Sequence, residues 1–136
     1  MDFLKSMAIA ASGLRAQAGR MRIISENIAN ADSTPTAAGT DPYRRKVPTF
    51  QSDFDRELGV QLVELGKVQT DTSDFKLKYE PGHPAADVNG NVKYPNVNPL
   101  VEMTDMREAQ RSYEANVNVI SATRRMLQRT IDILKA

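Results

Sequence analysis

Cysteine and tryptophan are absent from this 136-residue chain, and histidine occurs only once. A chain without cysteine has no disulfide and no thiolate metal site, and it is safe in an oxidising compartment. Aromatic residues make up only 6% of the sequence, so the large side chains that usually anchor a compact core are scarce. Because small domains already bury a modest share of their surface, we expect the chain to be marginally stable on its own.

An excess of either charge is also missing. The formal net charge is +1, whereas nucleic-acid-binding proteins normally carry a clear basic excess. The length fits one domain, or one helical unit with a small insert. We therefore expect no nucleic-acid partner.

Long apolar runs are lacking. No stretch approaches the roughly 20 apolar residues that a membrane span requires, so we expect no membrane insertion. The apolar stretch from Met7 to Ala11 is interrupted by Ser12 and Gly13 and followed by arginines, unlike a secretory signal. If the protein leaves the cytoplasm, we expect export without a cleaved signal peptide.

What the sequence does contain is an apolar residue at every seventh position near each end. At the N-terminal end these residues are Met7, Leu14, Met21 and Ile28. This spacing predicts a helix over residues 3–30 whose apolar stripe packs against another helix, although an ordinary amphipathic core helix is the alternative. Gly13 and Gly19 each weaken the helix by roughly 1 kcal/mol, so it needs partners, and the polar string from Asn30 to Pro35 ends it.

The second series predicts a helix from about Leu100 to Leu134, roughly 50 Å long. Its members are Met106, Tyr113, Ile120, Leu127 and Leu134. A more polar flank runs beside them through Ala109, Asn116, Thr123 and Thr130. Arg124 and Arg125 lie at the edge of the stripe, where we expect them to meet acidic residues of a neighbour. A helix this long cannot be covered by its own short chain, so most of its partner surface must come from other molecules.

The predicted fold is mainly α, with the two terminal helices packed together as a coiled-coil-like pair and a small, irregular, β-rich insert between them. We divide the chain into an N-terminal helix and cap (1–34), a loop and extended insert (35–99) and a long C-terminal helix (100–136). Residues 1–34 and 100–136 together are expected to form one helical domain. Short strands are predicted at 46–50, 60–65 and 75–79, and the last alternates apolar and basic residues. Asn89-Gly90 is a strong hairpin signal.

Residues that could perform chemistry are few. His83 is the only histidine, so it cannot head a common zinc site. The string from Asp87 to Asn91 resembles the start of an EF-hand loop, but Val92 stands where that loop needs glycine and Asn98 where it needs glutamate. The basic run from Tyr43 to Lys46 could contact phosphate or an acidic partner, and solvated charge or a subunit contact is the interpretation that we favour. We expect no metal, cofactor or catalytic site.

Several strings resemble one known family. They are Ser-Glu-Asn-Ile-Ala-Asn-Ala-Asp-Ser at 25–33, Pro-Tyr-Arg-Arg-Lys at 42–46, Tyr-Glu-Pro-Gly-His-Pro-Ala-Ala-Asp at 79–87, Asn-Gly-Asn-Val-Lys-Tyr-Pro-Asn-Val-Asn at 89–98 and Ala-Gln-Arg-Ser-Tyr-Glu-Ala-Asn at 109–116. The chain is similar, from its first helix to its last, to the bacterial flagellar basal-body rod proteins, and most closely to their proximal-rod members. Residues 35–41 and 52–74 are the least recognisable parts.

The resemblance implies a non-enzymatic axial subunit of a hollow helical rod in the flagellar basal body, spanning the periplasm and transmitting torque. Its implied partners are copies of itself, other rod and basal-body proteins and, during secretion, the flagellar type III export apparatus. The predicted helical assembly interface comprises Met7, Leu14, Met21, Asn27, Ile28, Asn30, Met106, Tyr113, Asn116, Ile120, Leu127 and Leu134. The predicted contacts of the insert comprise Tyr43, Arg44, Arg45, Tyr79, Pro81, Tyr94 and Asn96.

Two other functions stay open at this stage. An intracellular coiled-coil adaptor or scaffold would explain the seven-residue spacing but not the turn-rich strings of the middle segment. A small hydrolase could use His83 with Asp87 or Glu80. A purified adaptor would be a defined oligomer, and a hydrolase would lose its function when His83 is replaced by Ala.

Overall fold

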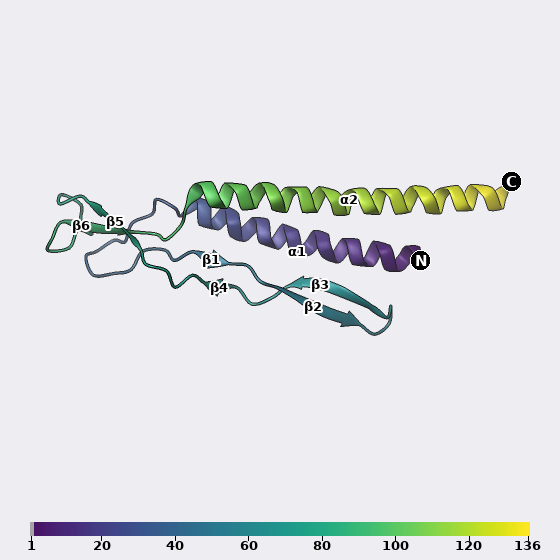
Figure 1. Ribbon diagram of the computed structural model, residues 1–136, viewed down its shortest axis with the longest axis horizontal. Coiled ribbons are helices and arrows are strands. Elements are labelled where there is room, and N and C mark those ends of the chain that lie inside the picture. Colours follow the sequence, from purple (N-terminus) through teal and green to yellow (C-terminus); the bar gives the residue numbers. More distant parts are fainter. Residues whose placement is uncertain (1) are drawn as a thin grey trace. The chain divides into compact units, whose positions relative to one another are not determined.

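The computed structural model describes residues 2–136 and contains two long helices and six short strands (Figure 1). Helix α1 spans Phe3–Ala29 and helix α2 spans Pro99–Lys135. Between them the strands are β1 (Lys46–Val47), β2 (Phe50–Asp55), β3 (Val60–Leu65), β4 (Gln69–Thr70), β5 (Lys76–Tyr79) and β6 (Asn91–Tyr94). The two predicted helices and the small β-containing middle are confirmed. The helices hold 47% of the residues, so α structure is less dominant than expected.

Helix boundaries follow local chemistry. At the start of α2, the Asn98 side chain accepts a hydrogen bond from the backbone N–H of Leu100 (3.1 Å), which caps the first turn, and Pro99 occupies the position where a missing N–H costs nothing. At the end of α1, the Asn30 side chain donates to the backbone carbonyl of Glu26 (2.8 Å). These polar residues therefore end and begin the helices where the sequence predicted.

The strands form three separate antiparallel pairs: β1 with β4, β2 with β3, and β5 with β6. Strand β2 starts at the end of the predicted 46–50 strand and runs on to Asp55, because its register with β3 joins Phe50 to Leu65 and Asp55 to Val60. Pro48 lies between β1 and β2, in keeping with the rule that proline interrupts a strand. The predicted single strand over 46–50 is thus two strands that pair with different partners.

The Asn89-Gly90 hairpin prediction was only partly right. Gly90 has a positive φ of 81°, and its N–H bonds to the Asp87 carbonyl (3.0 Å) while the Asp87 N–H bonds to Asn91 (2.9 Å). The tight turn is therefore present. The strand that pairs with β6 is not the segment just before this turn but β5, with Tyr79 opposite Asn91, so the two strands are joined by a longer loop.

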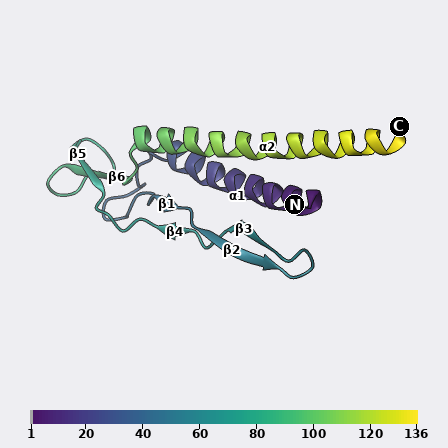
Figure 2. The same ribbon diagram turned by 45° about the vertical axis from the view of Figure 1, so that its right-hand side comes forward.

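The chain consists of two compact units, each of which contains parts of both helices. The first unit comprises residues up to Met21, Thr49–Lys67 and Arg107–Ala136. In it, α1 lies between the β2–β3 hairpin and α2 in both views (Figures 1 and 2). Its buried side chains are small: Ala10, Ser12, Ala16, Ala109 and Thr123.

The second unit comprises Arg22–Pro48 and Val68–Met106. Its core mixes branched aliphatic side chains with two fully buried polar ones. The aliphatic members include Ile23, Ile24, Val92 and Val97, and the polar ones are Asn27 and Glu102. Buried polar groups need partners, and these two belong to the hydrogen-bonded network described next.

Candidate functional site

Asn27 is the centre of a polar network in the second unit, which we call the polar junction. Its side chain is fully buried and makes four hydrogen bonds. The amide nitrogen donates to the Lys46 carbonyl (2.8 Å) and to a carboxylate oxygen of Glu102 (3.3 Å). The amide oxygen accepts from the Tyr43 hydroxyl (2.7 Å) and from the Lys46 N–H (3.0 Å). All four bonding positions of the amide are thus used, and one α1 side chain fixes both β1 and the start of α2.

Glu102 is the buried acid of the polar junction, with only 1% of its surface exposed. Its carboxylate accepts a hydrogen bond from the Arg45 Nε. The Arg45 guanidinium also lies 3.6 Å from Asp71 and 3.8 Å from Asp105. Burial by itself lowers the pKa of Arg45, but the bond and charge of Glu102, with the two aspartates, raise it overall. A buried carboxylate needs such a partner.

Two loop segments join the polar junction through Asn96 and Arg44. The Asn96 side-chain oxygen accepts from the Arg45 N–H (2.8 Å), and its nitrogen donates to the carbonyls of Asp71 and Ser73 (both 3.1 Å). Arg44 donates to the same two carbonyls and lies over the Phe75 ring at 4.2 Å. The run from Tyr43 to Lys46 therefore makes hydrogen bonds and ion pairs within its own chain.

Two pKa shifts report this environment. Burial, reinforced by the charges of Glu26 and Glu102, raises the pKa of Tyr43 to about 12. Hydrogen bonds from Ser73 and the nearby Arg45 guanidinium hold the pKa of Asp71 below its ordinary value. Both shifts favour the hydrogen-bonding form seen in the structure, namely a protonated phenol and an ionised carboxylate.

The remaining insert residues lie at the β5–β6 pair. The Tyr94 hydroxyl donates to Glu80 (3.0 Å), and Lys78 pairs with the same carboxylate (3.0 Å). The side chains of Tyr79 and Pro81 lie against Gly90, where an added Cβ would come within 2.8 Å and 3.2 Å of them. Tyr79 is nevertheless 70% exposed, so its outer face is free for a neighbour.

The predicted helical interface is only partly covered within the chain. Most of its apolar members are half-buried: Met7, Leu14, Met21, Ile28, Met106, Tyr113 and Ile120. Leu127 and Leu134 are exposed, the latter at 80%. The α2 positions buried inside the chain are instead Glu102, Ala109 and Thr123, with half-buried Asn116 between them. The polar flank thus faces inward, while the apolar series is left at the edge.

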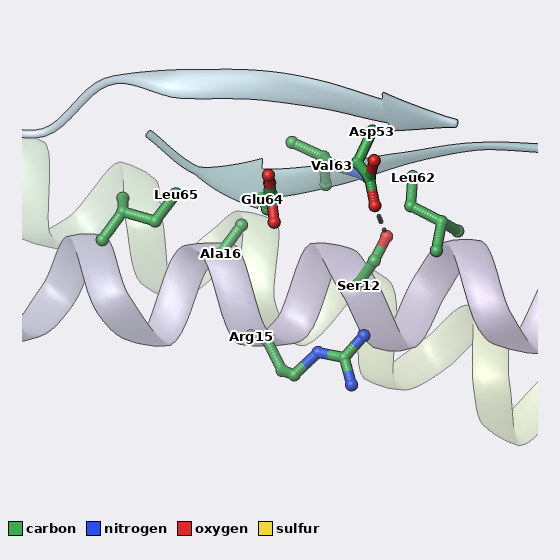
Figure 3. Close-up of a pocket in the computed structure, with 8 residues that line it drawn as sticks. All are labelled: Ser12, Arg15, Ala16, Asp53, Leu62, Val63, Glu64 and Leu65. Atoms are coloured by element: carbon green, nitrogen blue, oxygen red, sulfur yellow. Dashed lines mark hydrogen bonds between the residues drawn. The ribbon is translucent and has the colours of Figure 1, made fainter. Parts of the chain in front are cut away.

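Within the first unit, α1 also holds the β2–β3 hairpin. The Ser12 hydroxyl donates to the Ile9 carbonyl (2.7 Å) and accepts from the Val63 N–H (3.3 Å). A groove of about 310 Å³ beside this contact has Asp53 and Glu64 from the hairpin and Arg15 from α1 among its lining residues (Figure 3). It contains no nucleophile–base pair, and no metal-binding cluster exists in the part of the chain that the structure describes.

Known proteins match this chain along its whole length. It is 58% identical over 137 residues to the flagellar basal-body rod protein FlgC of Agrobacterium fabrum, covering 100% of this chain and 99% of the relative. It is 39% identical to the FlgC proteins of Bacillus subtilis (99% and 100% covered) and Salmonella typhimurium (98% of each). The chain belongs to the flagellar basal-body rod protein family.

Two family profiles match separate segments of this rod-family chain. Residues 7–37 match the profile described as flagella basal body rod protein, and residues 88–133 match the one described as flagellar basal body rod FlgEFG protein C-terminal. The first segment contains Asn27, and the second contains Glu102. Each matched segment therefore supplies one of the two buried polar residues of the junction.

The hydrolase hypothesis fails both on the family and on the geometry. The relatives are named as rod proteins and not as enzymes. The His83 Nδ1 accepts the Ala85 N–H (3.0 Å), and the Asp87 carboxylate accepts the N–H groups of Asn89 (2.8 Å) and Asn91 (2.9 Å). Both side chains shape their own loop.

Among residues 2–136, no helix combines the length and the apolar content needed to cross a membrane.

Sequence reasoning missed several residues of the polar junction. Glu102, Asp71 and Ser73 are not among the predicted site residues, and Lys46 is predicted only as part of the basic run. The only signal in the sequence is a glutamate in the first turn of a predicted helix, in a chain that also carries adjacent arginines. Nothing local showed which arginine would reach it.

Proposed function

We propose that this chain is a structural axial subunit of the proximal rod of the bacterial flagellum, which polymerises to form the drive shaft and the export channel. The proposal rests on the sequence similarity to FlgC rod proteins, which extends over the full length of the chain. The exposed apolar side chains along α2 support it, because a polymer gives them partners that a single chain lacks. A head-to-tail contact repeated around an axis produces an open helical filament.

In the polymer, α1 and α2 of neighbouring copies pair in a coiled-coil-like manner, so that residues 1–34 and 100–136 act as one helical domain. The apolar series from Met7 to Ile28 and from Met106 to Leu134, with Asn27, Asn30 and Asn116, contributes to this layer. The exposed faces of Tyr79 and Pro81, with Tyr94 beside them, contact adjacent rod proteins. Tyr43, Arg44, Arg45 and Asn96 support that contact from the polar junction.

The subunit reaches the rod through the flagellar type III export apparatus without a cleaved signal peptide. The glycines of α1 support this step, since a helix weakened at Gly13 and Gly19 unfolds more readily for passage through a narrow channel. Its partners are copies of itself and the other rod and basal-body proteins.

Deleting the gene tests this function. Deleted cells should be non-motile and should lack rod, hook and filament, while the membrane ring remains visible by electron microscopy. Expression of the wild-type chain should restore all three structures. Swimming cells with intact rods after deletion would refute the proposal.

A point variant links the function to the helical interface. Leu127→Asp puts a charge on an exposed apolar position of α2 and should abolish motility. Gln110→Asp, at an exposed position of the same helix, is the matched control and should swim normally. Equal motility of the two variants would remove Leu127 from the interface.

An adaptor protein, the alternative, would instead purify as a defined cytoplasmic oligomer.

A further inference from the structure

The last three turns of α2 form a basic and apolar surface that the chain leaves uncovered. Thr123 is the last buried residue of the helix, and every residue from 124 to 135 is exposed. We call these residues the tail. It carries the basic residues Arg124, Arg125, Arg129 and Lys135, one acidic residue, Asp132, and the apolar residues Met126, Leu127, Ile131, Ile133 and Leu134.

The β2–β3 hairpin, residues 50–65, has the opposite charge. It carries four acidic residues, Asp53, Asp55, Glu57 and Glu64, and one basic residue, Arg56. Phe50 and Phe54 are 44% and 54% exposed on it. A shallow groove of about 430 Å³ runs between the hairpin and Ile9 of α1, and Phe50, Ser52 and Val63 are among its lining residues. The hairpin thus combines an apolar groove with a net negative charge.

The charges of both surfaces lack an ion-pair partner within the described part of the chain. Within residues 2–136, none of the four hairpin carboxylates and none of the four tail cations takes part in an ion pair. In the first unit α1 lies between the hairpin and α2 (Figures 1 and 2), so the hairpin does not contact the tail of its own chain. Complementary charges that stay unpaired in one copy can pair between copies, where they set the register and speed encounter.

We propose that the β2–β3 hairpin of one copy docks on the tail of a second copy. Ile131 of the tail, which lies outside the seven-residue apolar series, occupies the groove beside Phe50, and the tail arginines pair with the carboxylates of the hairpin. The contact is heterologous, joining two different surfaces, so it leaves a free hairpin and a free tail at the two ends for further copies. This proposal deepens the rod-forming function and rests on it.

Cysteine cross-linking tests the contact, because the chain has no cysteine of its own. Full-length Phe54→Cys and Ile131→Cys variants are mixed and oxidised. A disulfide-linked heterodimer should form in excess of either homodimer, and its yield should fall at least about threefold between low and high salt as the charges are screened. A predominance of Ile131→Cys homodimers, or a yield that is independent of salt, would overturn the proposal.

Charge reversal provides the second arm. Asp53→Lys with Glu57→Lys reverses the hairpin while sparing Asp55, whose carboxylate caps the turn. Arg125→Glu with Arg129→Glu reverses the tail. Reversing the hairpin charges in the Phe54→Cys copy, or the tail charges in the Ile131→Cys copy, should reduce cross-linking several-fold. Reversing both should restore it, and a failure of this rescue contradicts the pairing.

Two controls complete the design. Arg107→Glu with Arg111→Glu reverses two exposed charges of α2 outside the tail and should leave cross-linking unchanged. Circular dichroism should show equal helix content in all variants. Binding of the tail to vesicles of equal parts phosphatidylcholine and phosphatidylglycerol, without any heterodimer, would assign the tail to a lipid surface and overturn the proposal.

Complementation of the deletion strain separates this proposal from the proposed function. If the wild-type chain restores motility but the two cysteines never cross-link in isolated basal bodies, the hairpin–tail contact is refuted and the rod function stands. If the wild-type chain does not restore motility, the rod function itself is refuted.

Discussion

Asn27 shows how a single residue can hold several segments in place. Its amide is fully buried and makes four hydrogen bonds to Tyr43, Lys46 and Glu102. A buried donor or acceptor that loses its partner costs about 1–3 kcal/mol, so removing the amide affects several groups at once.

We expect Asn27→Ala to lower the free energy of unfolding by at least about 2 kcal/mol, because it leaves the Glu102 carboxylate and the Lys46 backbone short of partners. Urea denaturation followed by circular dichroism measures the change. Asn30→Ala is the matched control, since the Asn30 side chain bonds only the Glu26 carbonyl of its own helix. The control should lose less than about 1 kcal/mol. Equal losses would contradict the central role of Asn27.

Tyr43 predicts a dependence of stability on alkaline pH. Its folded pKa, about 12, lies above the ordinary value near 10. The stabilisation from its protonated hydroxyl is therefore complete below pH 10 and is lost as the pH rises from 10 through 12. We expect wild type to be more stable than Tyr43→Phe at pH 8 and this advantage to shrink above pH 10. Urea titrations of both proteins at several pH values test this, and a constant difference would disprove it.

At the scale of elements, the packing of α1 on α2 depends on small residues. An added Cβ at Gly13 would lie 2.8 Å from the Asn116 side-chain nitrogen, so this glycine permits a close approach of the helices in the first unit. The Asn116 nitrogen itself donates to the Ser112 carbonyl of its own helix (3.0 Å). Gly13 therefore lowers the stability of the helix but leaves room for the Asn116 side chain.

A double-mutant cycle checks this coupling. Gly13→Ala alone should be close to neutral or destabilising, because the helix propensity gained is offset by displacement of Asn116. In the Asn116→Ala background the same change should stabilise the protein by about 1 kcal/mol, the usual advantage of alanine over glycine. Thermal or urea unfolding of the four proteins gives the coupling energy. A gain of the same size in both backgrounds would show that the Gly13–Asn116 contact has no influence.

The elements also show where patterns lead to errors. Seven-residue spacing located both helices, because apolar periodicity is a property of the segment itself. It did not show which face each helix turns inward. Inside the chain α2 buries Ala109 and Thr123, since small side chains let the helices approach closely, while Leu127 and Leu134 stay exposed. Likewise Leu77 of β5 is 63% exposed, so the alternation of that strand does not mark a core face.

At the scale of the whole molecule, a large exposed apolar surface predicts a difference between the free chain and the assembled one. Residues 124–135 of α2 have no cover within the chain. A helix segment without tertiary contacts opens easily, so its amides should exchange rapidly with deuterium in the free subunit and slowly in isolated rods. Hydrogen-exchange mass spectrometry compares the two states. Amides in the second half of α1 and in β6, which carry buried side chains, should differ much less.

Strong protection of the tail in a monomeric subunit would contradict this prediction and would also weaken the case for an interface completed by other copies. The same measurement on the Leu127→Asp variant provides a control. Its tail should exchange as fast as that of the wild-type monomer, because the substitution acts on assembly and not on the fold of the free chain.

Helix periodicity, capping residues and motif strings are local properties of the chain, so the sequence alone predicts the two long helices, their ends near Asn30 and Leu100, and the family. Three features are visible only in the folded chain: Glu102 is buried against Arg45 and Asn27, a hairpin begins at Phe50, and the polar flank of α2 faces inward. These features depend on which distant residues meet. Burial and pairing arise from contacts between segments that are far apart along the chain, and no periodicity within one segment specifies them.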